Sequence, residues 1–227
     1  MQILSQGKTK FNSKKSGKKS PQFSPHVRFG MKHEVYNLFP SSVHYIHIEN
    51  FQSVKERVIS YIYNERKKSK DSAVLSNRGG WQSESNYHLH DNILQNIVSG
   101  GLSSYWDYYK KLKFSYNGIW FNINNQGHYN LMHSHAGCEL SGVLWIKTPS
   151  NCGALEFQSP HEFNGDRNLR LLHEEFKEKT YNYPAFRFNP MEGCMIIFPS
   201  YLYHHVESNQ SDEDRISLSF NINLDLV

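Results

Sequence analysis

The segment GHYNLMHSHAGCELSGV, residues 127–143, carries two histidines, His133 and His135, separated by a single residue. Because side chains alternate along a β-strand, both imidazoles would project from the same face. A second cluster, His204-His205, follows about seventy residues later in the stretch FPSYLYHHVE. A histidine from a distant strand can complete a facial set of ligands around one metal ion. The pattern therefore predicts a metal centre on a β-sheet scaffold.

The second cluster offers two candidates for the third ligand. His204 and His205 point to opposite faces of a strand, so only one of them can join the site. Alternation favours His204 if Val206 and Ser208 share its side of the strand. His205 is kept as the alternative ligand.

A rival pair, His88-Leu89-His90, lies in a polar loop just before Asp91. Asp91 is well suited to cap the helix that follows. We therefore expect His88 and His90 to be structural or surface residues rather than metal ligands.

The apolar pattern predicts helices in the first half of the chain. Apolar residues recur at helical spacing over 51–68, after an expected strand at 43–48. A Gly-containing loop is expected at 75–85 and a second helix over 92–112, in which Gly100-Gly101 predicts a break or kink. Residues 164–180 have weak helical spacing and are expected to form a loop or lid.

Short β-rich runs bounded by Asn, Gly and Pro follow from residue 114 onward. They predict strands at 118–124, 129–133, 140–147, 154–158, 181–188, 194–198, 204–207 and 215–224. Such spacing favours a sandwich or jelly roll with the helices packed outside. The predicted fold class is thus mainly β with flanking helices.

Charge divides the chain. Residues 1–33 carry eight Lys or Arg and no acid, so the other residues hold 17 basic and 21 acidic side chains, a net charge of about −4. The basic segment has too little apolar content to fold alone, and residues 34–227 are expected to form one domain. The tail is interpreted either as a simple disordered extension or as a contact for nucleic acid or another polyanion.

Cysteine usage and hydropathy indicate the compartment. Cys138, Cys152 and Cys194 are odd in number and form no CxxC pair, which argues against a disulfide framework. No apolar run approaches the ~18 residues that a membrane span needs, and no signal peptide is visible. The sequence therefore predicts a soluble, cytoplasmic protein.

Several motifs together resemble a known family. They are GHYNLMHSH followed by Ser141-Gly142-Val143, then GALEF at 153–157, FPSYLYHHV at 198–206, RISLSFN at 215–221 and, upstream, SNRGGWQS at 76–83. Over residues 35–226 the chain resembles the 2-oxoglutarate/Fe(II)-dependent oxygenases of bacterial and phage type.

The resemblance implies a double-stranded β-helix (jelly roll, cupin-like) that binds Fe(II) and 2-oxoglutarate. The ligands would be His133, His135 and His204, the last selected over His205 by its distance from the valine. Arg215 would hold the C5 carboxylate of 2-oxoglutarate through its planar fork, with Ser217 adding a hydroxyl. The implied reaction consumes O2, converts 2-oxoglutarate to succinate and CO2, and hydroxylates a substrate that the sequence does not identify.

Three residues before the HxH pair are candidate pocket residues. Asn122 and Tyr129 are predicted to contact the co-substrate, and Trp120 to line the pocket. Their alternative role is that of ordinary strand residues.

One residue departs from the wider superfamily, which places Asp or Glu where this chain has His135. Either the site has three histidines or a carboxylate such as Glu139 takes part. Gly127, His133, His135 and Glu139 also fit most of the first metal motif of the cupins. A cupin-like metalloprotein that does not use 2-oxoglutarate, or a non-enzymatic module with a nucleic-acid-binding tail, therefore stays open as an alternative.

Overall fold

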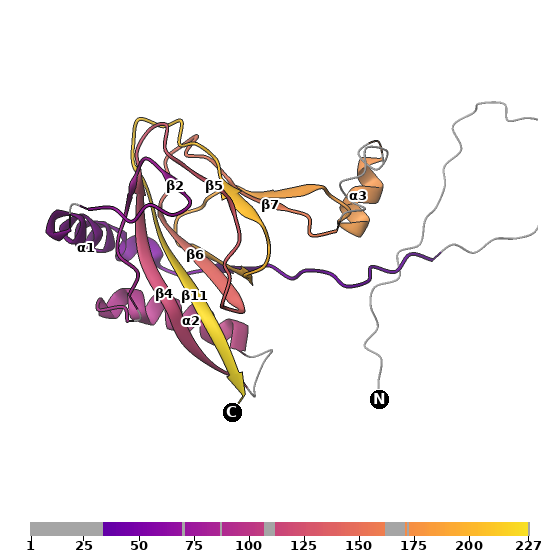
Figure 1. Cartoon of the computed structure of the whole chain (residues 1–227), viewed down its shortest axis with the longest axis horizontal. Coiled ribbons are helices and arrows are strands. Elements are labelled where there is room, and N and C mark those ends of the chain that lie inside the picture. Colours follow the sequence, from indigo (N-terminus) through magenta and orange to yellow (C-terminus); the bar gives the residue numbers. More distant parts are fainter. Residues whose placement is uncertain are drawn as a thin grey trace, which may run out of the picture. The chain divides into compact units, whose positions relative to one another are not determined.

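A computed structural model describes residues 34–69, 71–86, 88–106, 112–161, 171 and 173–226 (Figure 1). The chain divides into two compact units. The larger comprises Ser41–Leu171 and Tyr183–Val227, and the smaller Met1–Pro40 and Leu172–Asn182. The predicted basic tail, residues 1–33, lies outside the described residues.

Two antiparallel sheets form the larger unit, in the spatial orders β1-β9-β6-β11-β4-β3 and β2-β5-β10-β7-β8. This arrangement confirms the predicted mainly β jelly roll. The six-stranded sheet contains β1 (His44–His47), β3 (Trp81–Gln82), β4 (Leu112–Asn124), β6 (Leu140–Lys147), β9 (Cys194–Pro199) and β11 (Arg215–Leu226). The five-stranded sheet contains β2 (Asn77–Arg78), β5 (Tyr129–His133), β7 (Leu155–Gln158), β8 (Ala185–Phe188) and β10 (His204–Val206).

Alternation along β11 separates the core from the interior cavity. Every second residue of this strand is apolar and buried, and packs in one cluster with the helices; these residues are Ile216, Leu218, Phe220 and Ile222. The polar residues between them line a cavity on the opposite face; these are Arg215, Ser217, Ser219 and Asn221. A period-2 sequence therefore buries one face against helices and presents a polar face to a ligand site.

Two helices supply the apolar partner of that sheet. They are α1 (Lys55–Lys68), which follows the short 3₁₀ turn η1 (Phe51–Ser53), and α2 (Asn92–Trp106). Asp91 caps α2 as predicted, because its Oδ1 accepts hydrogen bonds of 3.0 Å from both Ile93 N and Leu94 N. The predicted end of this helix at residue 112 is wrong, since Leu112 begins β4 and pairs with Leu226 of β11.

The expected loop at 75–85 contains two short strands, one in each sheet. β2 pairs with β5 in one sheet and β3 pairs with β4 in the other. Gly79 and Gly80 connect them at φ angles of 67° and 70°, a backbone region that glycine adopts without strain. The segment thus carries the chain from one sheet to the other, and Gln82 of β3 lines the cavity.

The break predicted at Gly100-Gly101 is wrong, because α2 runs through both residues. Gly101 instead allows a close approach to β9. A Cβ there would lie 2.8 Å from Cε of Met195, whereas a Cβ on Gly100 would meet nothing within 4 Å.

The two glycines are therefore expected to respond oppositely to alanine. Gly100→Ala should raise the free energy of unfolding by about 0.5–1 kcal/mol through helix propensity. Gly101→Ala should lower it by about 1–3 kcal/mol, because Met195 is fully buried and must repack. Urea denaturation of the two variants tests this, and equal stabilisation by both would contradict the packing argument.

The smaller unit contains α3 (Glu174–Thr180), with Lys177–Glu174 and Lys179–Glu175 ion pairs of 2.7 and 2.6 Å. The loop or lid predicted over 164–180 is thus helical at its end, while 162–170 and 172 lie outside the described residues. The strand predicted from residue 181 begins only at Ala185, because Tyr181 ends the helix at φ 56°. No helix in the described part of the chain has the length and apolarity of a membrane span.

Candidate metal and co-substrate site

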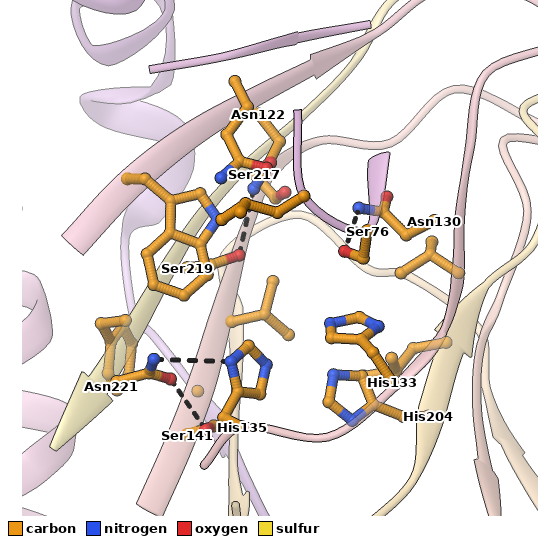
Figure 2. Close-up of a pocket in the computed structure, with 18 of the residues that line it drawn as sticks. Ser76, Asn122, Asn130, His133, His135, Ser141, His204, Ser217, Ser219 and Asn221 are labelled. Carbon is orange, nitrogen blue, oxygen red and sulfur yellow. Dashed lines mark hydrogen bonds between the residues drawn. The ribbon is translucent and has the colours of Figure 1, made fainter. Parts of the chain in front are cut away.

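Three histidines from two loop–strand regions converge inside the jelly roll (Figure 2). His133 ends β5, His135 follows it, and His204 begins β10. One ligand nitrogen from each lies within 4.8 Å of the others, and this is the sole such group of His, Cys, Asp or Glu among the described residues. The ring centroids are 5.0 Å apart for His133–His135, 4.4 Å for His133–His204 and 5.2 Å for His135–His204.

Strand pairing produces this convergence. β5 and β10 are antiparallel neighbours, and His133 lies directly opposite His204. The next pair is Asn130 opposite Val206, so three residues of β5 span two residues of β10. This irregularity resembles a β-bulge, which re-aims the side chains of one strand. His133 and Asn130 consequently both line the cavity.

Hydrogen bonds orient two of the imidazoles. His133 Nδ1 lies 2.7 Å from the carbonyl oxygen of Leu131, and His204 Nδ1 lies 2.8 Å from that of Leu202. A carbonyl oxygen only accepts, so each Nδ1 carries the proton and donates it. The Nε2 atom of each ring then keeps its lone pair, which is the form in which histidine binds a metal.

Burial favours the neutral imidazoles. It lowers the pKa of His133, and lowers those of His135 to about 4 and His204 to about 3, with smaller effects from the neighbouring histidines. Neutral nitrogen atoms are consequently present at physiological pH. A metal ion would find the ligands already deprotonated.

Metal-free protein is expected to lose stability as the pH falls from about 7.5 to about 5. The ordinary pKa of 6.5 exceeds the folded values of about 4 for His135 and about 3 for His204, so the unfolded chain binds more protons in this window. The stability that the neutral histidines contribute is fully present above pH 6.5 and is lost as the pH falls toward their pKa values in the folded protein. Urea denaturation across this range tests it, and His135→Ala should show a shallower pH dependence. Equal slopes in wild type and variant would contradict it.

Arg215 is a buried cation at the start of β11, 3% exposed. Its Nη1 donates to the carbonyl oxygen of Cys152 and, over 3.1 Å, to that of Glu207. Its Nη2 is buried without a hydrogen-bond partner among the described residues, and no carboxylate there forms an ion pair with it. Burial lowers the pKa of Arg215 to about 10, so it stays protonated near neutral pH.

The buried and partly unpaired guanidinium of Arg215 costs folding free energy unless an anion binds beside it. A buried charge without a counterion is unfavourable, and an unpaired donor adds to that cost. Because Arg215 lines the cavity, an anionic group bound there can provide both a counterion for the charge and a hydrogen-bond acceptor for Nη2.

The cavity itself has a volume of about 660 Å³ and is lined by the three histidines and by polar residues of the larger sheet. Of the sequence candidates, Asn122, Ser217 and Trp120 line it. Asn122 is buried and donates a hydrogen bond of 3.1 Å to Ser219 Oγ, and the Trp120 ring lies 5.9 Å from that of His135.

Three other candidates do not join this group. Tyr129 does not line the cavity and is 39% exposed, because the irregularity in β5 turns Asn130 inward in its place. The Glu139 carboxylate instead accepts a hydrogen bond of 2.8 Å from Leu224 N. His205 lies outside the histidine group, and its buried Nδ1 has no partner among the described residues.

The rival histidines, His88 and His90, lie apart from this site. They line a separate cavity of about 160 Å³ beside Trp81 and Phe121, and belong to no metal-competent group in the described residues. This agrees with the expectation that they are not metal ligands.

Four residues that line the cavity were not predicted from the sequence as site residues. Gln82 and Asn124 are buried and line the cavity, as do Ser219 and Asn221. The alternation of apolar and polar residues along 119–124 and 215–222 could have predicted that the polar residues of β4 and β11 face the cavity. Gln82 is different, because only the pairing of β3 with β4 brings it to the cavity.

Comparisons with known proteins relate part of the chain to a family. Residues 118–221, which contain all three histidines and Arg215, match the family described as "Putative 2OG-Fe(II) oxygenase". No curated protein matches the chain.

Solved structures share the fold at low sequence identity. A prolyl-4-hydroxylase from Pseudomonas putida is 14% identical, covering 80% of this chain and 92% of its own with a TM-score of 0.54. The viral collagen prolyl hydroxylase of Paramecium Bursaria Chlorella virus-1, in its 2OG complex, is 14% identical over 78% of this chain and 94% of its own (TM-score 0.51). HygX from Streptomyces hygroscopicus, with nickel and 2-oxoglutarate bound, is 9% identical over 81% and 83% (TM-score 0.57). The family match over residues 118–221 and the shared fold agree, so the chain is similar to the 2-oxoglutarate/Fe(II) oxygenases in both sequence motifs and fold.

Proposed function

We propose that this oxygenase is a hydroxylase in which His133, His135 and His204 bind Fe(II) and Arg215 binds the distal carboxylate of 2-oxoglutarate. The observation that most supports this proposal is the Nη2 of Arg215, which has no hydrogen-bond partner among the described residues. Arg215 is a buried cation that lines the same cavity as the three histidines. A dicarboxylate that reaches from the histidines to Arg215 would satisfy this donor. Neither a structural metal site nor an inert sheet interior calls for such a cation.

The donor set fits the metal. Imidazole nitrogen is a common ligand of iron, and the low pKa values of His135 and His204 keep these rings neutral. Three neutral imidazoles leave the charge of a divalent ion undiminished, so an anionic co-substrate is attracted to it. The protonated Arg215 supplies the second positive group for the other carboxylate.

Bound Fe(II) would supply the activation of O2 that couples decarboxylation of 2-oxoglutarate to oxidation of a C–H bond. The protein's own residues bind and orient. Arg215 fixes the distal carboxylate, and Ser217 and Asn122 offer polar contacts on adjacent strands.

The cupin-like alternative has lost its main support. It required Glu139 as a fourth ligand, and that carboxylate instead accepts a hydrogen bond from Leu224 N. The three-histidine set is therefore the ligand set we propose.

Anaerobic titration of 2-oxoglutarate into Fe(II)-loaded protein tests this function. We expect a visible metal-to-ligand charge-transfer band in wild type, and succinate release on admission of O2. Iron that binds without producing the band would contradict chelation of 2-oxoglutarate. Failure to bind iron at all would contradict the metal assignment itself.

We further propose O2 as the oxidant, a reducing compartment such as the cytoplasm, and a polyanion contact through residues 1–33. Cys138, Cys152 and Cys194 are all free thiols, which suits a reducing compartment. The eight basic residues of the tail support the polyanion contact. Removing residues 1–33 should abolish a salt-sensitive interaction with nucleic acid while leaving succinate formation intact.

A further inference from the structure

The Nδ1 atoms of the three clustered histidines meet different kinds of partner. Those of His133 and His204 face main-chain carbonyl oxygens, which fix the proton on Nδ1. The Nδ1 of His135 lies 3.4 Å from Nδ2 of Asn221, the nitrogen end of the side-chain amide. An amide can either donate or accept, depending on which of its two ends faces the ring.

Asn221 is held in place by its strand pairing. It lies on the cavity face of β11, directly opposite Ser141 of β6, whose hydroxyl is 2.8 Å from its Oδ1. Figure 2 shows the Asn221 amide between the hydroxyl of Ser141 and the ring of His135.

The oxygen and nitrogen of this amide can exchange places at no cost in shape. Amide orientation is assigned from the surrounding hydrogen bonds, because the two ends have nearly the same size. With Oδ1 toward His135, Nδ2 faces the Ser141 hydroxyl, which accepts a hydrogen bond as readily as it donates one. The positions of His135, Asn221 and Ser141 therefore accommodate either orientation.

Metal binding decides between the two orientations. Ligation through Nε2 needs a free lone pair there, so the proton of the neutral ring must be on Nδ1. An amide nitrogen facing Nδ1 would donate to it and drive the proton to Nε2, where it blocks the metal. An amide oxygen facing Nδ1 does the reverse.

We propose that Asn221 is a positioning residue: with its amide turned so that Oδ1 faces the ring, it accepts a hydrogen bond from His135 Nδ1 and thereby holds Nε2 of His135 ready for the metal. This rests on the proposed metal site. An imidazole at the middle ligand position needs its tautomer to be fixed, a requirement that a carboxylate at this position would not have. In this role Asn221 acts on the metal through His135 rather than by ligating the metal itself.

Metal affinity measured by anaerobic calorimetry with Co(II) tests the role of Asn221. Asn221→Ala should weaken Co(II) binding by about tenfold to a hundredfold, the usual cost of losing a residue that orients a ligand. Asn221→Asp should retain affinity within about threefold, because a carboxylate accepts from Nδ1–H and cannot donate. Loss of affinity in Asn221→Asp equal to that in Asn221→Ala would overturn the acceptor role.

Asn223→Ala is the matched control. Asn223 lies two residues further along β11 and contacts Asn117, over 3.2 Å, rather than a histidine. Its replacement should leave the Co(II) affinity unchanged. An equal loss in Asn223→Ala and Asn221→Ala would indicate a general strand effect and overturn the proposal.

The tautomer can be read directly in wild-type protein, which avoids any question of variant folding. In metal-free protein labelled with ¹⁵N-histidine, we expect the NMR shifts of His135 to show a protonated Nδ1. A protonated Nε2 would overturn the proposal even if metal binds. Wild type that binds no Co(II) would overturn the proposed metal site as well, whereas normal binding by Asn221→Ala would overturn only the role of Asn221.

Discussion

Replacing His204 with alanine is expected to weaken metal binding by at least about a hundredfold. The free energy of metal binding at a four-ligand structural site is about 10–16 kcal/mol, and each ligand contributes a share of it. His204 is 4% exposed and its ring lies between those of His133 and Phe198, with centroid distances of 4.4 and 4.9 Å. Because the position is buried, a water molecule has poor access to replace the imidazole nitrogen as a metal ligand. Metal content after dialysis, and calorimetry with Fe(II) under anaerobic conditions, measure the effect.

His205→Ala is the matched control for this variant. It removes the same side chain from the adjacent position on β10, which lies outside the histidine group. Metal affinity should remain that of wild type. Equal losses in both variants would mean that β10 is disrupted as a whole, and the reverse order would transfer the ligand role to His205.

Replacing Arg215 with methionine is expected to weaken 2-oxoglutarate binding at least about a hundredfold while metal content is retained. Each hydrogen bond to a charged group contributes about 1.5–3 kcal/mol, and Nη2 can offer two such bonds. Methionine fills much of the same volume without the charge. The dissociation constant of 2-oxoglutarate, measured on metal-loaded protein, gives the effect.

Arg215→Lys separates charge from geometry. Lysine keeps the cation but cannot bond the carbonyl oxygens of Cys152 and Glu207 and a ligand carboxylate through a planar fork. We expect an affinity between those of wild type and Arg215→Met. Wild-type affinity for 2-oxoglutarate in Arg215→Met would remove Arg215 from the co-substrate site.

The two replacements also test different halves of the site. Loss of metal in His204→Ala should abolish the charge-transfer band at any 2-oxoglutarate concentration. Arg215→Met should recover the band when 2-oxoglutarate is raised, since the histidine ligands are intact. A band that is beyond recovery in both variants would indicate that Arg215 also supports the histidines.

Local sequence determined the parts of the fold that depend on one strand or helix at a time. Short β-rich runs bounded by Asn, Gly and Pro located β5, β6 and β9 nearly to the residue, and the His133–His135 spacing indicated their shared site. The Asp91 cap could likewise be read directly, because capping involves only the next three residues. These features follow from short-range geometry, so one sequence suffices to predict them.

Tertiary structure decided everything that depends on which strands become neighbours. The pairing of β5 with β10 set His204 against His133, and its irregular register turned Asn130 inward and Tyr129 out. The approach of α2 to β9 let Gly101 serve as a packing surface instead of a helix break.

The same distinction holds for the site. The sequence contained His135, Asn221, Ser141 and Arg215, and motif resemblance supplied roles for two of them. That Asn221 of β11 meets His135, which follows β5 of the other sheet, is decided only by tertiary packing, and that Arg215 has an unpaired nitrogen follows only from its burial. Residue identity determines which chemistry is available, and long-range packing decides which groups are close enough, and dry enough, to use it.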